Sequence, residues 1–458
     1  MSDRIKVDPL TRIEGHLKAE YSTQNGVIEN ARIAGTMYRG FENFLIGRHP
    51  FDAVRITQRI CGVCHEVHGA ASCMAIEQLY GMTLPHNGVL LREFILGLSI
   101  ISDHILHFYQ LLLPDYVDFS FMTKSSGFVS RPDNAKLISV KEKNTELAEN
   151  YRSAIKIRGL IGEALAAIGA KTPFCHALLP GGVTVKVTPD KLLKIRSVVN
   201  DVHLFLHQCM EHDAHLIADF FTDYFDKGVS YGRFISGGAF VLKGKPLYDA
   251  GVYSGGRISK LDTGKIGEDI SRTFLNDDNI PQPDKKNAYS WVKTPAYGGK
   301  YYETGPMARA VVSGSERYAD AVKKHGADYR RSSVMNRVLA RMTESLDIAE
   351  YMIDVLGSYE LNMSTINDPD LSLKLTGEGE AVSIASRGML IHRLKTREGK
   401  IEKYDLIVPS TWNFGPGGKE PGVAEKALNG TSYGKEESGV VAGRVVRSFD
   451  PCLACAVH

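Results

Sequence analysis

The sequence predicts a mainly α protein with small β elements, an α+β fold in which long helices form a central bundle and β-hairpins lie near both chain ends. Two observations predict this fold: apolar residues recur at helical spacing over long central stretches, and β-prone runs flank turn signals toward each end. The chain has 458 residues, 43% hydrophobic and 24% charged, which suits a large core and excludes a disordered chain. Because no internal repeat divides it, we expect residues 1–458 to form a single domain.

Hairpins are expected where two β-prone runs flank a short turn. Such runs extend from 17 to 33 around Asn25-Gly26, a strong signal for a two-residue turn. Near the other end, strands are expected over 381–395 and 403–408, and a short turn joins them. Small β elements are therefore predicted toward both ends of the chain.

Helices are expected where apolar positions repeat every three to four residues. One is expected over 64–80 with Gly81 as its stop, and another over 90–112, ending before Pro114. Further helices are expected over 146–168, 190–225, 307–324 and 333–356. Between 228 and 305 the chain is rich in Gly, Tyr, Pro and Lys, which predicts an irregular layer that covers the helices.

Charge and hydropathy argue against several classes of function. Lys and Arg number 55 against 53 Asp and Glu, a net charge of +2, which argues against a nucleic-acid-binding surface. No apolar run approaches the ~18 residues that suggest a membrane span. The first residues lack the apolar stretch of a secretory signal. We therefore expect no nucleic-acid partner and no membrane span in the chain itself.

Seven cysteines are too few, and odd in number, for a disulfide scaffold, so their placement is the informative part. Cys61 and Cys64 form one C-x-x-C motif, and Cys452 and Cys455 form another. Such motifs occur in zinc sites, redox disulfides and iron-bearing clusters. Zinc ribbons usually place their pairs ~15–20 residues apart, and a redox pair needs a βαβ context; neither fits this chain. Spacing alone leaves open both a shared metal site and two unrelated thiol pairs.

The residues that flank the pairs favour the shared metal site. Cys64 stands just before an expected helix, where N–H groups and the helix dipole favour a thiolate. His68 lies one turn further on, where it can hydrogen-bond a coordinated sulfur. His458 follows the second pair by three residues, so we expect it to be held in place although chain ends are commonly disordered.

The two pairs with their neighbours, RICGVCHEVH over 59–68 and DPCLACAVH over 450–458, resemble the paired signatures of nickel–iron hydrogenase large subunits. Other segments resemble the family in family order. These are TRIEGH over 11–16, MYRGFE over 37–42, DHILHFY over 103–109, GGVT over 181–184, GPMAR over 305–309, RG over 387–388 and VPSTWN over 408–413. They span nearly the whole chain, and two such pairs at opposite ends are highly specific.

The resemblance implies a nickel–iron centre. It implies four thiolate ligands to nickel, with the second cysteine of each pair bridging to an iron that carries CO and cyanide. The nickel ligands are Cys61, Cys64, Cys452 and Cys455, and the two that bridge to iron are Cys64 and Cys455. Soft thiolates suit both metals. The resemblance also implies a Mg²⁺ ion held by the Glu42 carboxylate, the backbone carbonyl of Leu406 and the His458 ring.

The resemblance further implies roles in the cleavage of H2. H2 is a very weak acid, so heterolytic cleavage needs a metal to accept hydride and a base to accept the proton. The candidate bases are Cys452 and Arg387, and we prefer the thiolate because a guanidinium is normally protonated. Glu14 resembles the first proton relay beyond the cysteine. The resemblance also implies that Asp103, Asp450 and Arg387 form a charged canopy beside the metals. It implies that Ser410 and Arg387 donate hydrogen bonds to the cyanides.

Partners and location also follow from the resemblance. The family uses a small subunit that bears iron–sulfur clusters, and this sequence lacks the Cys-rich pattern of an electron relay. We therefore expect a heterodimer, or a dimer of heterodimers, that releases protons from H2 and passes electrons to the partner. Since the partner usually carries the export signal, we expect a periplasmic or membrane-associated complex, with a cytoplasmic one as the alternative. The family removes a C-terminal extension, so a chain that ends at His458 resembles the mature form.

Three other functions are compatible with parts of the pattern. A hydrogen-sensing regulatory subunit would use the same site with low turnover. The homologous quinone-oxidoreductase subunit of respiratory complexes keeps the fold but lacks both cysteine pairs, which are present here. A structural zinc protein would contain zinc alone. The leading prediction is the catalytic subunit of a nickel–iron hydrogenase, an oxidoreductase with H2 as donor.

Overall fold

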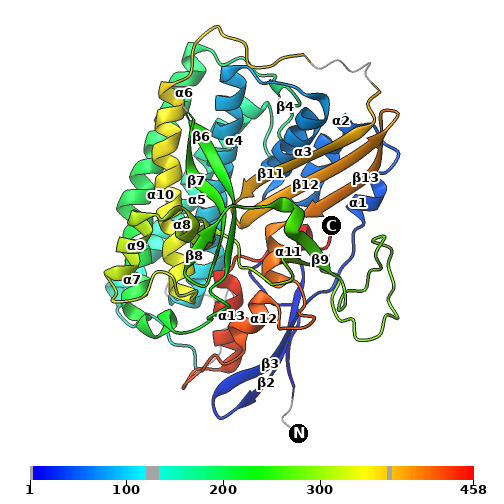
Figure 1. Ribbon diagram of the computed structural model, residues 1–458. Helices are drawn as coiled ribbons and strands as arrows, with labels where there is room; N and C mark the ends of the chain where they lie inside the picture. The colour runs from blue at the N-terminus through cyan, green and yellow to red at the C-terminus, as the bar shows by residue number, and fades with distance from the viewer. Residues whose placement is uncertain (1–3, 120–133, 243, 369–373) are drawn as a thin grey trace.

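Long helices packed side by side form the larger part of the molecule in the computed structural model, which describes residues 4–119, 134–242, 244–368 and 374–458 (Figure 1). The helix α10 is central, since it packs against α4, α6, α7, α8, α9 and α13. The long helices are α4 (His86–Ile105), α5 (Lys141–Gly169), α6 (Pro189–Phe205), α7 (Glu211–Phe220) and α10 (Val334–Gly357). Small sheets accompany this bundle, which confirms the predicted mainly α fold with small β elements.

The predicted helices are present, with two informative differences. The single helix expected over 307–324 is wrong, because the chain forms α8 (Pro306–Ser313) and α9 (Glu316–Lys323). Gly314 adopts φ 66° and ends α8, and the Ser315 side chain then accepts a hydrogen bond from the Tyr318 N–H to start α9. The helices expected over 90–112 and 190–225 each include a π-helical turn: η2 (Leu106–Leu112) follows α4, and η5 (Leu206–Met210) lies between α6 and α7.

A three-stranded antiparallel sheet near the C-terminal end lies against α3 (His65–Tyr80). Its strands are β11 (Gly377–Ala385), β12 (Gly388–Arg397) and β13 (Lys400–Ile407). The hairpin between β12 and β13 is as predicted, but the single strand expected over 381–395 is wrong. The chain reverses at Ser386 and Arg387, where Ala385 pairs with Gly388. This tight turn carries the Arg387 side chain to the cysteine pairs.

Two further sheets lie elsewhere along the chain. The expected N-terminal hairpin is present as β2 (Leu17–Gln24) and β3 (Val27–Gly35), with β1 (Ile5–Val7) added at its edge. The region expected to be irregular, 228–305, is more regular than predicted. It contains the antiparallel sheet of β6 (Phe234–Leu242), β7 (Lys245–Ser254) and β8 (Arg257–Ser259), and the pair β9 (Ile266–Asp269) and β10 (Thr294–Tyr297).

Shorter elements complete the described chain. The helices are α1 (Phe41–Phe44), α2 (Pro50–Thr57), α11 (Pro409–Phe414), α12 (Val423–Leu428), α13 (Ser438–Ser448) and α14 (Leu453–Ala456). The 3-10 and π turns are η1 (Gln58–Ile60), η2 (Leu106–Leu112), η3 (Leu113–Asp115), η6 (Thr222–Phe225) and η7 (Thr263–Lys265), and the remaining strands are β4 (Leu178–Leu179) and β5 (Gly182–Val183). Among the described helices, none is both long and apolar enough to cross a membrane.

Buried charges are paired where the helices meet the C-terminal sheet. On α10, Glu344 accepts hydrogen bonds from Arg309 of α8 at 2.5 and 2.6 Å and contacts His104 of α4 at 2.7 Å. Arg309 also donates to the backbone oxygens of Ala385 and Ser386. Since an unpaired buried charge is costly, these contacts fix the helices relative to the turn that carries Arg387.

Candidate metal centre

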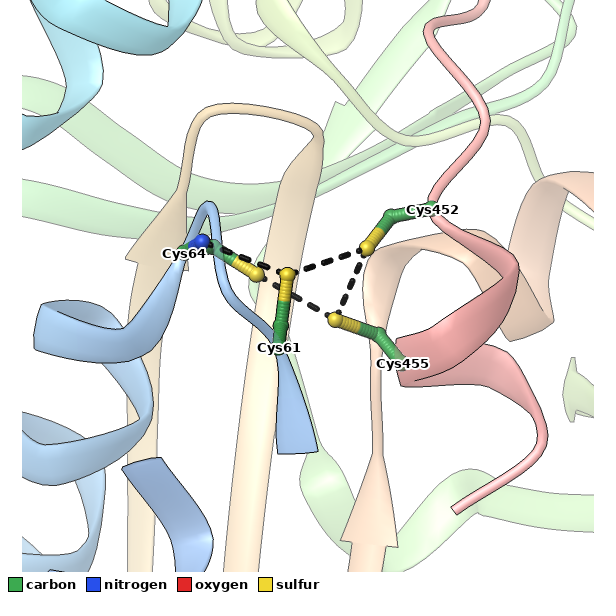
Figure 2. Close-up of side chains that lie close together, drawn as sticks. All are labelled: Cys61, Cys64, Cys452 and Cys455. Atoms are coloured by element: carbon green, nitrogen blue, oxygen red, sulfur yellow. Dashed lines mark hydrogen bonds between the residues drawn. The ribbon is translucent and has the colours of Figure 1, made fainter. Parts of the chain in front are cut away.

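The four cysteines of the two pairs meet in the interior. Their sulfur atoms all lie within 4.8 Å of one another, and all four residues are buried. Sγ of Cys61 is 3.4 Å from Sγ of Cys452, and Sγ of Cys64 is 3.2 Å from Sγ of Cys455. The two sulfurs of the C-terminal pair are 3.0 Å apart. Figure 2 shows the four side chains converging from the segment before α3 and from α14. The structure therefore brings both motifs to one site.

Backbone geometry holds the N-terminal pair. Cys64 is the N-cap of α3, so the sulfurs lie beside the positive end of a helix. Sγ of Cys61 accepts hydrogen bonds from the N–H groups of Val63 at 3.2 Å and Cys64 at 3.3 Å. Hydrogen bonds from backbone N–H groups stabilise a thiolate. This half of the site thus favours negative sulfur before any cation binds.

The crowding of four thiols fits a bound cation. Hydrogen bonds from the neighbouring cysteines, Cys452 first, lower the pKa of Cys61 well below its ordinary value. Burial raises the pKa of Cys452 and Cys455 well above theirs. Four thiolates so close together repel one another, and divalent cations remove that repulsion because metal binding requires deprotonated ligands. A buried set of four sulfurs suits nickel and iron.

The C-terminal pair is held by contacts with distant segments. Glu14 and Cys452 form a parallel β-bridge, in which Leu453 N–H donates to the Glu14 carbonyl at 2.8 Å. Ser410 Oγ accepts a hydrogen bond from Cys452 N–H at 3.0 Å. A serine hydroxyl that accepts in this way keeps one hydrogen to donate, so Ser410 can serve a second acceptor at the site.

Glu14 places a carboxyl group beside the sulfur of Cys452. Oε2 of Glu14 is 3.2 Å from Sγ of Cys452 and accepts from Ala454 N–H at 3.3 Å. Burial raises the pKa of Glu14 from its ordinary value. The close approach depends on Gly15, since at φ 80° a Cβ there would lie 2.5 Å from Ala454 N. A proton on the sulfur therefore has an acceptor in contact.

A buried canopy of charge lies over the cysteines. Arg387 donates to the backbone oxygen of Asp450 at 3.0 Å and to its Oδ1 at 3.1 Å, and it lies 3.5 Å from Oδ2 of Asp103. Ser386 Oγ donates to the same Asp103 oxygen at 2.8 Å. Burial raises the pKa of Asp103 to about 7, although the charge of Arg387 opposes the shift. The structure thus joins three predicted residues and adds Ser386.

His68 lies at the start of a hydrogen-bonded chain that the sequence did not reveal. Its Nε2 is 3.5 Å from Sγ of Cys455, and its Nδ1 is 3.1 Å from Nε2 of His392. Nδ1 of His392 is 2.8 Å from the Tyr404 hydroxyl, which is 3.2 Å from Oγ of Ser72. His392 and Tyr404 come from β12 and β13, whose apolar alternation gave no signal that these polar groups share one buried chain.

The sulfur of Cys455 determines which ring nitrogen of His68 and of His392 carries the hydrogen. Burial lowers the pKa of His68 to about 4 and that of His392 well below its ordinary value, so both rings are neutral and each carries one N–H. A coordinated thiolate only accepts hydrogen bonds, so His68 must present Nε2–H to Cys455. His68 Nδ1 then accepts from His392 Nε2–H, and His392 Nδ1 accepts from the Tyr404 hydroxyl, whose single hydrogen then points to His392 instead of to Ser72 Oγ. The tyrosine therefore orients the histidine at the sulfur.

The residues predicted to hold Mg²⁺ meet next to the cysteines. His458 Nδ1 is 2.6 Å from the backbone oxygen of Cys455, to which it donates. The ring's Nε2 then carries a lone pair; it lies 3.5 Å from Oε1 of Glu42 and has no hydrogen-bond partner within the described ranges. Leu406 N–H donates to Glu42 at 2.8 Å, and because the N–H and C=O of one strand residue point to the same side, its carbonyl also faces Glu42. These ligands fit a small hard cation.

Two charged residues at this second site were missed by the sequence reasoning. Lys293 Nζ lies 3.0 and 3.1 Å from the oxygens of Glu42 and 3.1 Å from Glu268. Burial opposes ionisation of Glu42, but the charge of Lys293 and the hydrogen bond from Leu406 N–H lower its pKa to about 2. Both residues lie in or near strands of the region expected to be irregular, where no periodic pattern marks a buried charge.

Comparison with known proteins supports the same identity. The model of the family described as nickel-dependent hydrogenase matches residues 39–130 and 126–458. The chain is 32% identical to the periplasmic [NiFeSe] hydrogenase large subunit of Desulfomicrobium baculatum, over 99% of this chain and 95% of that protein. It is 29% identical to the hydrogenase-2 large chain of Escherichia coli, over 100% and 97%.

Solved structures show the same similarity in three dimensions. The Ni-Fe-Se hydrogenase from D. vulgaris Hildenborough in the reduced state superposes with a TM-score of 0.94 at 33% sequence identity, with 100% of each chain covered. A reduced, active form of the Ni-Fe-Se hydrogenase from Desulfomicrobium baculatum gives 0.94 at 32%. Together with the four cysteines buried at one site, these matches show that the chain belongs to the nickel-dependent hydrogenase family and is the large subunit of a nickel–iron hydrogenase.

Proposed function

We propose that this chain catalyses the reversible heterolytic cleavage of H2 and that the proton released from H2 leaves the site through Cys452 and Glu14. The observation that carries the proposal is a carboxyl oxygen 3.2 Å from a sulfur that belongs to a buried set of four. The printed names of the relatives are those of hydrogenases, which favours an enzyme over a hydrogen sensor. Family membership likewise favours nickel and iron over a structural zinc.

The proposed ligands follow from the donor sets. Four cysteines, Cys61, Cys64, Cys452 and Cys455, would hold nickel, and Cys64 and Cys455 would also hold an iron with CO and cyanide ligands. Glu42, the Leu406 carbonyl and His458 would hold Mg²⁺. When bound, the nickel–iron pair supplies the electron-accepting centre that polarises H2.

The chain's own residues move the proton. Cys452 Sγ takes up the proton, and the neighbouring Glu14 Oε2 accepts it and passes it outward. Arg387 is the poorer base: burial opposes its charge, but Asp450 and the cysteines raise its pKa well above the ordinary value. Arg387 therefore stays protonated, positions the canopy and, with the Ser410 hydroxyl, donates hydrogen bonds toward the iron ligands.

The assembly we propose has one large-subunit domain and a partner. One hydrophobic core includes residues from β2, α3, α4, α10 and α14, which supports a single domain over 1–458 whose two ends meet at the metal centre. Relatives are named as large subunits or large chains, which supports a small subunit as partner, and we propose that it carries iron–sulfur clusters. The name of one relative includes "periplasmic", which supports a periplasmic or membrane-associated complex over the cytoplasmic alternative.

The test combines metal analysis with turnover. The purified complex should contain nickel and iron in about one copy each per chain, and it should reduce an artificial electron acceptor with H2. The fully metallated large subunit alone should reduce that acceptor poorly, because the electron relay is on the partner. Zinc as the sole metal, or a metallated complex that turns over too slowly for an enzyme, would overturn the proposal; the latter would favour the sensor.

A further inference from the structure

A second cluster of metal-ligating side chains lies on the helical bundle, away from the cysteine-bearing elements. His203 of α6, His207 of η5 and Glu350 of α10 place one potential ligand atom each within 4.8 Å of the others. The helix α10 packs against both α6 and η5, so the cluster joins two neighbouring segments of the bundle. The hydrogenase chemistry described above uses none of these residues.

The backbone places the two histidines together. They are four residues apart, and their ring centroids are 4.5 Å apart. His207 belongs to the π-helical turn Leu206–Met210, and such single turns in otherwise α-helical segments occur frequently at functional sites. The turn brings His207 to the face of the helix that α10 covers, where Glu350 lies.

A carboxylate selects which nitrogen of His207 faces the cluster. Nδ1 of His207 is 3.1 Å from Glu211 one turn further along, so Glu211 accepts the Nδ1–H. Nε2, the other ring nitrogen, lies 3.7 Å from Oε1 of Glu350. Metal-ligating histidines characteristically donate their other ring N–H to a carboxylate in this way. Partial burial lowers the pKa of His203, although the Glu350 carboxylate opposes the shift.

The third potential ligand, Glu350, is also held in place by a hydrogen-bonded neighbour. Arg317 donates to both oxygens of Glu350, at 2.8 and 2.9 Å, and is itself held by Asp347 at 2.7 Å. A carboxylate has about four lone-pair positions, so this contact leaves Glu350 able to bind a cation. Three carboxylates, Glu211, Asp347 and Glu350, outnumber the one guanidinium of Arg317 around the two histidines, which favours a bound cation.

We propose that His203, His207 and Glu350 form a binding site for a divalent transition-metal ion of the Zn²⁺ class. Two imidazoles and a carboxylate are a common set of protein ligands for zinc, with water as the fourth. A zinc ion about 2.1 Å from each ligand atom holds those atoms about 3.4 Å apart, so the cluster needs only to contract slightly. The Glu350 side chain is 44% exposed, which leaves the ion an open route from solvent. The bound ion would join α6 and η5 to α10.

The test measures zinc uptake by the assembled, metallated hydrogenase, so that its result is independent of H2 turnover. The variants are His203→Gln and His207→Gln, with His212→Gln as the matched control. His212 lies on α7 and pairs with Glu146, outside the cluster. Zinc titration with equilibrium dialysis gives the number of ions per chain, and the melting temperature with and without zinc gives the linked stabilisation.

The wild-type complex and His212→Gln should each bind one more zinc per chain than the two cluster variants, whose affinity should fall at least about 10-fold. Zinc should raise the melting temperature of only the first two. Anomalous diffraction at the zinc edge should locate the ion between α6 and α10. Equal zinc uptake by all four proteins, or an ion found only at the site of Glu42 and His458, would overturn the proposal.

Discussion

The two cysteine pairs contribute the same side chains from supports that are built differently. Cys64 is the N-cap of α3, a 16-residue helix, and Cys61 precedes it, with its sulfur bound by the N–H groups of Val63 and Cys64. Cys455 lies on α14, a helix of four residues, and Cys452 is the N-cap just before it. Such a short segment has little stability of its own. Its position instead depends on the β-bridge to Glu14, the Ser410 hydroxyl and the His458 ring.

This difference separates two tasks. The N-terminal pair is held mainly by local contacts around the start of α3, together with Arg39, which donates to the backbone oxygens of Arg59 and Ile60. The C-terminal pair is positioned by contacts across hundreds of residues, and the same contacts place the proton acceptor Glu14 at Cys452. We therefore expect the metals and α14 to stabilise each other, whereas α3 should be stable without metal.

Loss of one nickel ligand should have the largest effect. Cys61→Ser and Cys452→Ser each remove a thiolate from a set of four, so both should lose nickel and H2 oxidation should fall to background. Hydrogen exchange in the nickel-free Cys61→Ser protein should nevertheless differ between the two supports. The amides of α14 should exchange at least about 10-fold faster than in the metallated protein, and those of α3 should be unchanged. Full nickel content in either variant would show that the cysteine is not a ligand.

The second prediction concerns Glu14, the residue that links the C-terminal pair to proton transfer. The amide oxygen of Glu14→Gln can still accept from Ala454 N–H, but the side chain can no longer take a proton. Metal content and the infrared bands of the iron ligands should stay as in the wild type, while H2 oxidation and exchange of deuterium with solvent should fall about 100-fold or more.

The matched control for this prediction is Glu29→Gln, on the adjacent strand β3 and without a contact to the cysteines. It should keep wild-type rates. If Glu14 only anchors the C-terminal segment, Glu14→Gln should also be nearly silent. Wild-type deuterium exchange in a fully metallated Glu14→Gln complex would reject the relay.

Local patterns in the sequence predicted the helices and strands better than the breaks and turns between them. The Asn25-Gly26 turn and the helix that ends at Gly81 are visible because each depends on a few neighbouring residues. The break at Gly314 was missed since glycine is tolerated within a helical pattern, and only its left-handed backbone reveals the cap. The turn at Ser386 and Arg387 was missed because β-prone residues lie on both sides of it, so the pattern alone extends over both strands as one run.

The candidate site divides in the same way. The cysteines carry a spacing signal, and the other predicted residues came from resemblance to a family rather than from any local pattern. His392 and Tyr404 had no signal of either kind, because each lies in an ordinary β-prone run, and Lys293 lies in the region that was expected to be irregular. Their roles arise from tertiary contacts, in which a buried polar group must find a partner wherever the fold supplies one.

The third prediction compares two glycines, one beside each pair. A Cβ at Gly15 would lie 2.5 Å from Ala454 N on a backbone with φ 80°, whereas a Cβ at Gly62 would meet nothing within 4 Å. Gly15→Ala should therefore displace α14, cost at least about 1 kcal/mol of stability and lower the nickel content. Gly62→Ala should be near wild type in both respects. Melting temperature and nickel per chain measure the difference; equal behaviour of the two variants would contradict the distinction between the supports.

The smallest predicted effect is at Tyr404, which is linked to the Cys455 sulfur by hydrogen bonds through His392 and His68. Tyr404→Phe keeps the ring and its packing but takes the donor from His392 Nδ1. Without this donor, His392 and in turn His68 can each adopt either neutral tautomer. The tautomer of His68 that donates Nε2–H to the sulfur is then less populated, and the hydrogen bond to the bridging thiolate weakens. Nickel content and folding should remain, H2 oxidation should fall about 10-fold, and the infrared bands of iron-bound CO and cyanide should shift.

Tyr116→Phe provides the control, because Tyr116 is also fully buried but its hydroxyl has no hydrogen-bond partner among the described residues. Removing that hydroxyl should leave both rate and infrared bands unchanged, since no hydrogen bond is lost. A general effect of losing a buried hydroxyl would move both variants alike. A shift of the bands in Tyr404→Phe alone shows that the tyrosine acts through the two histidines on the sulfur, whereas unshifted bands with a normal rate would mean that His68 is held by packing.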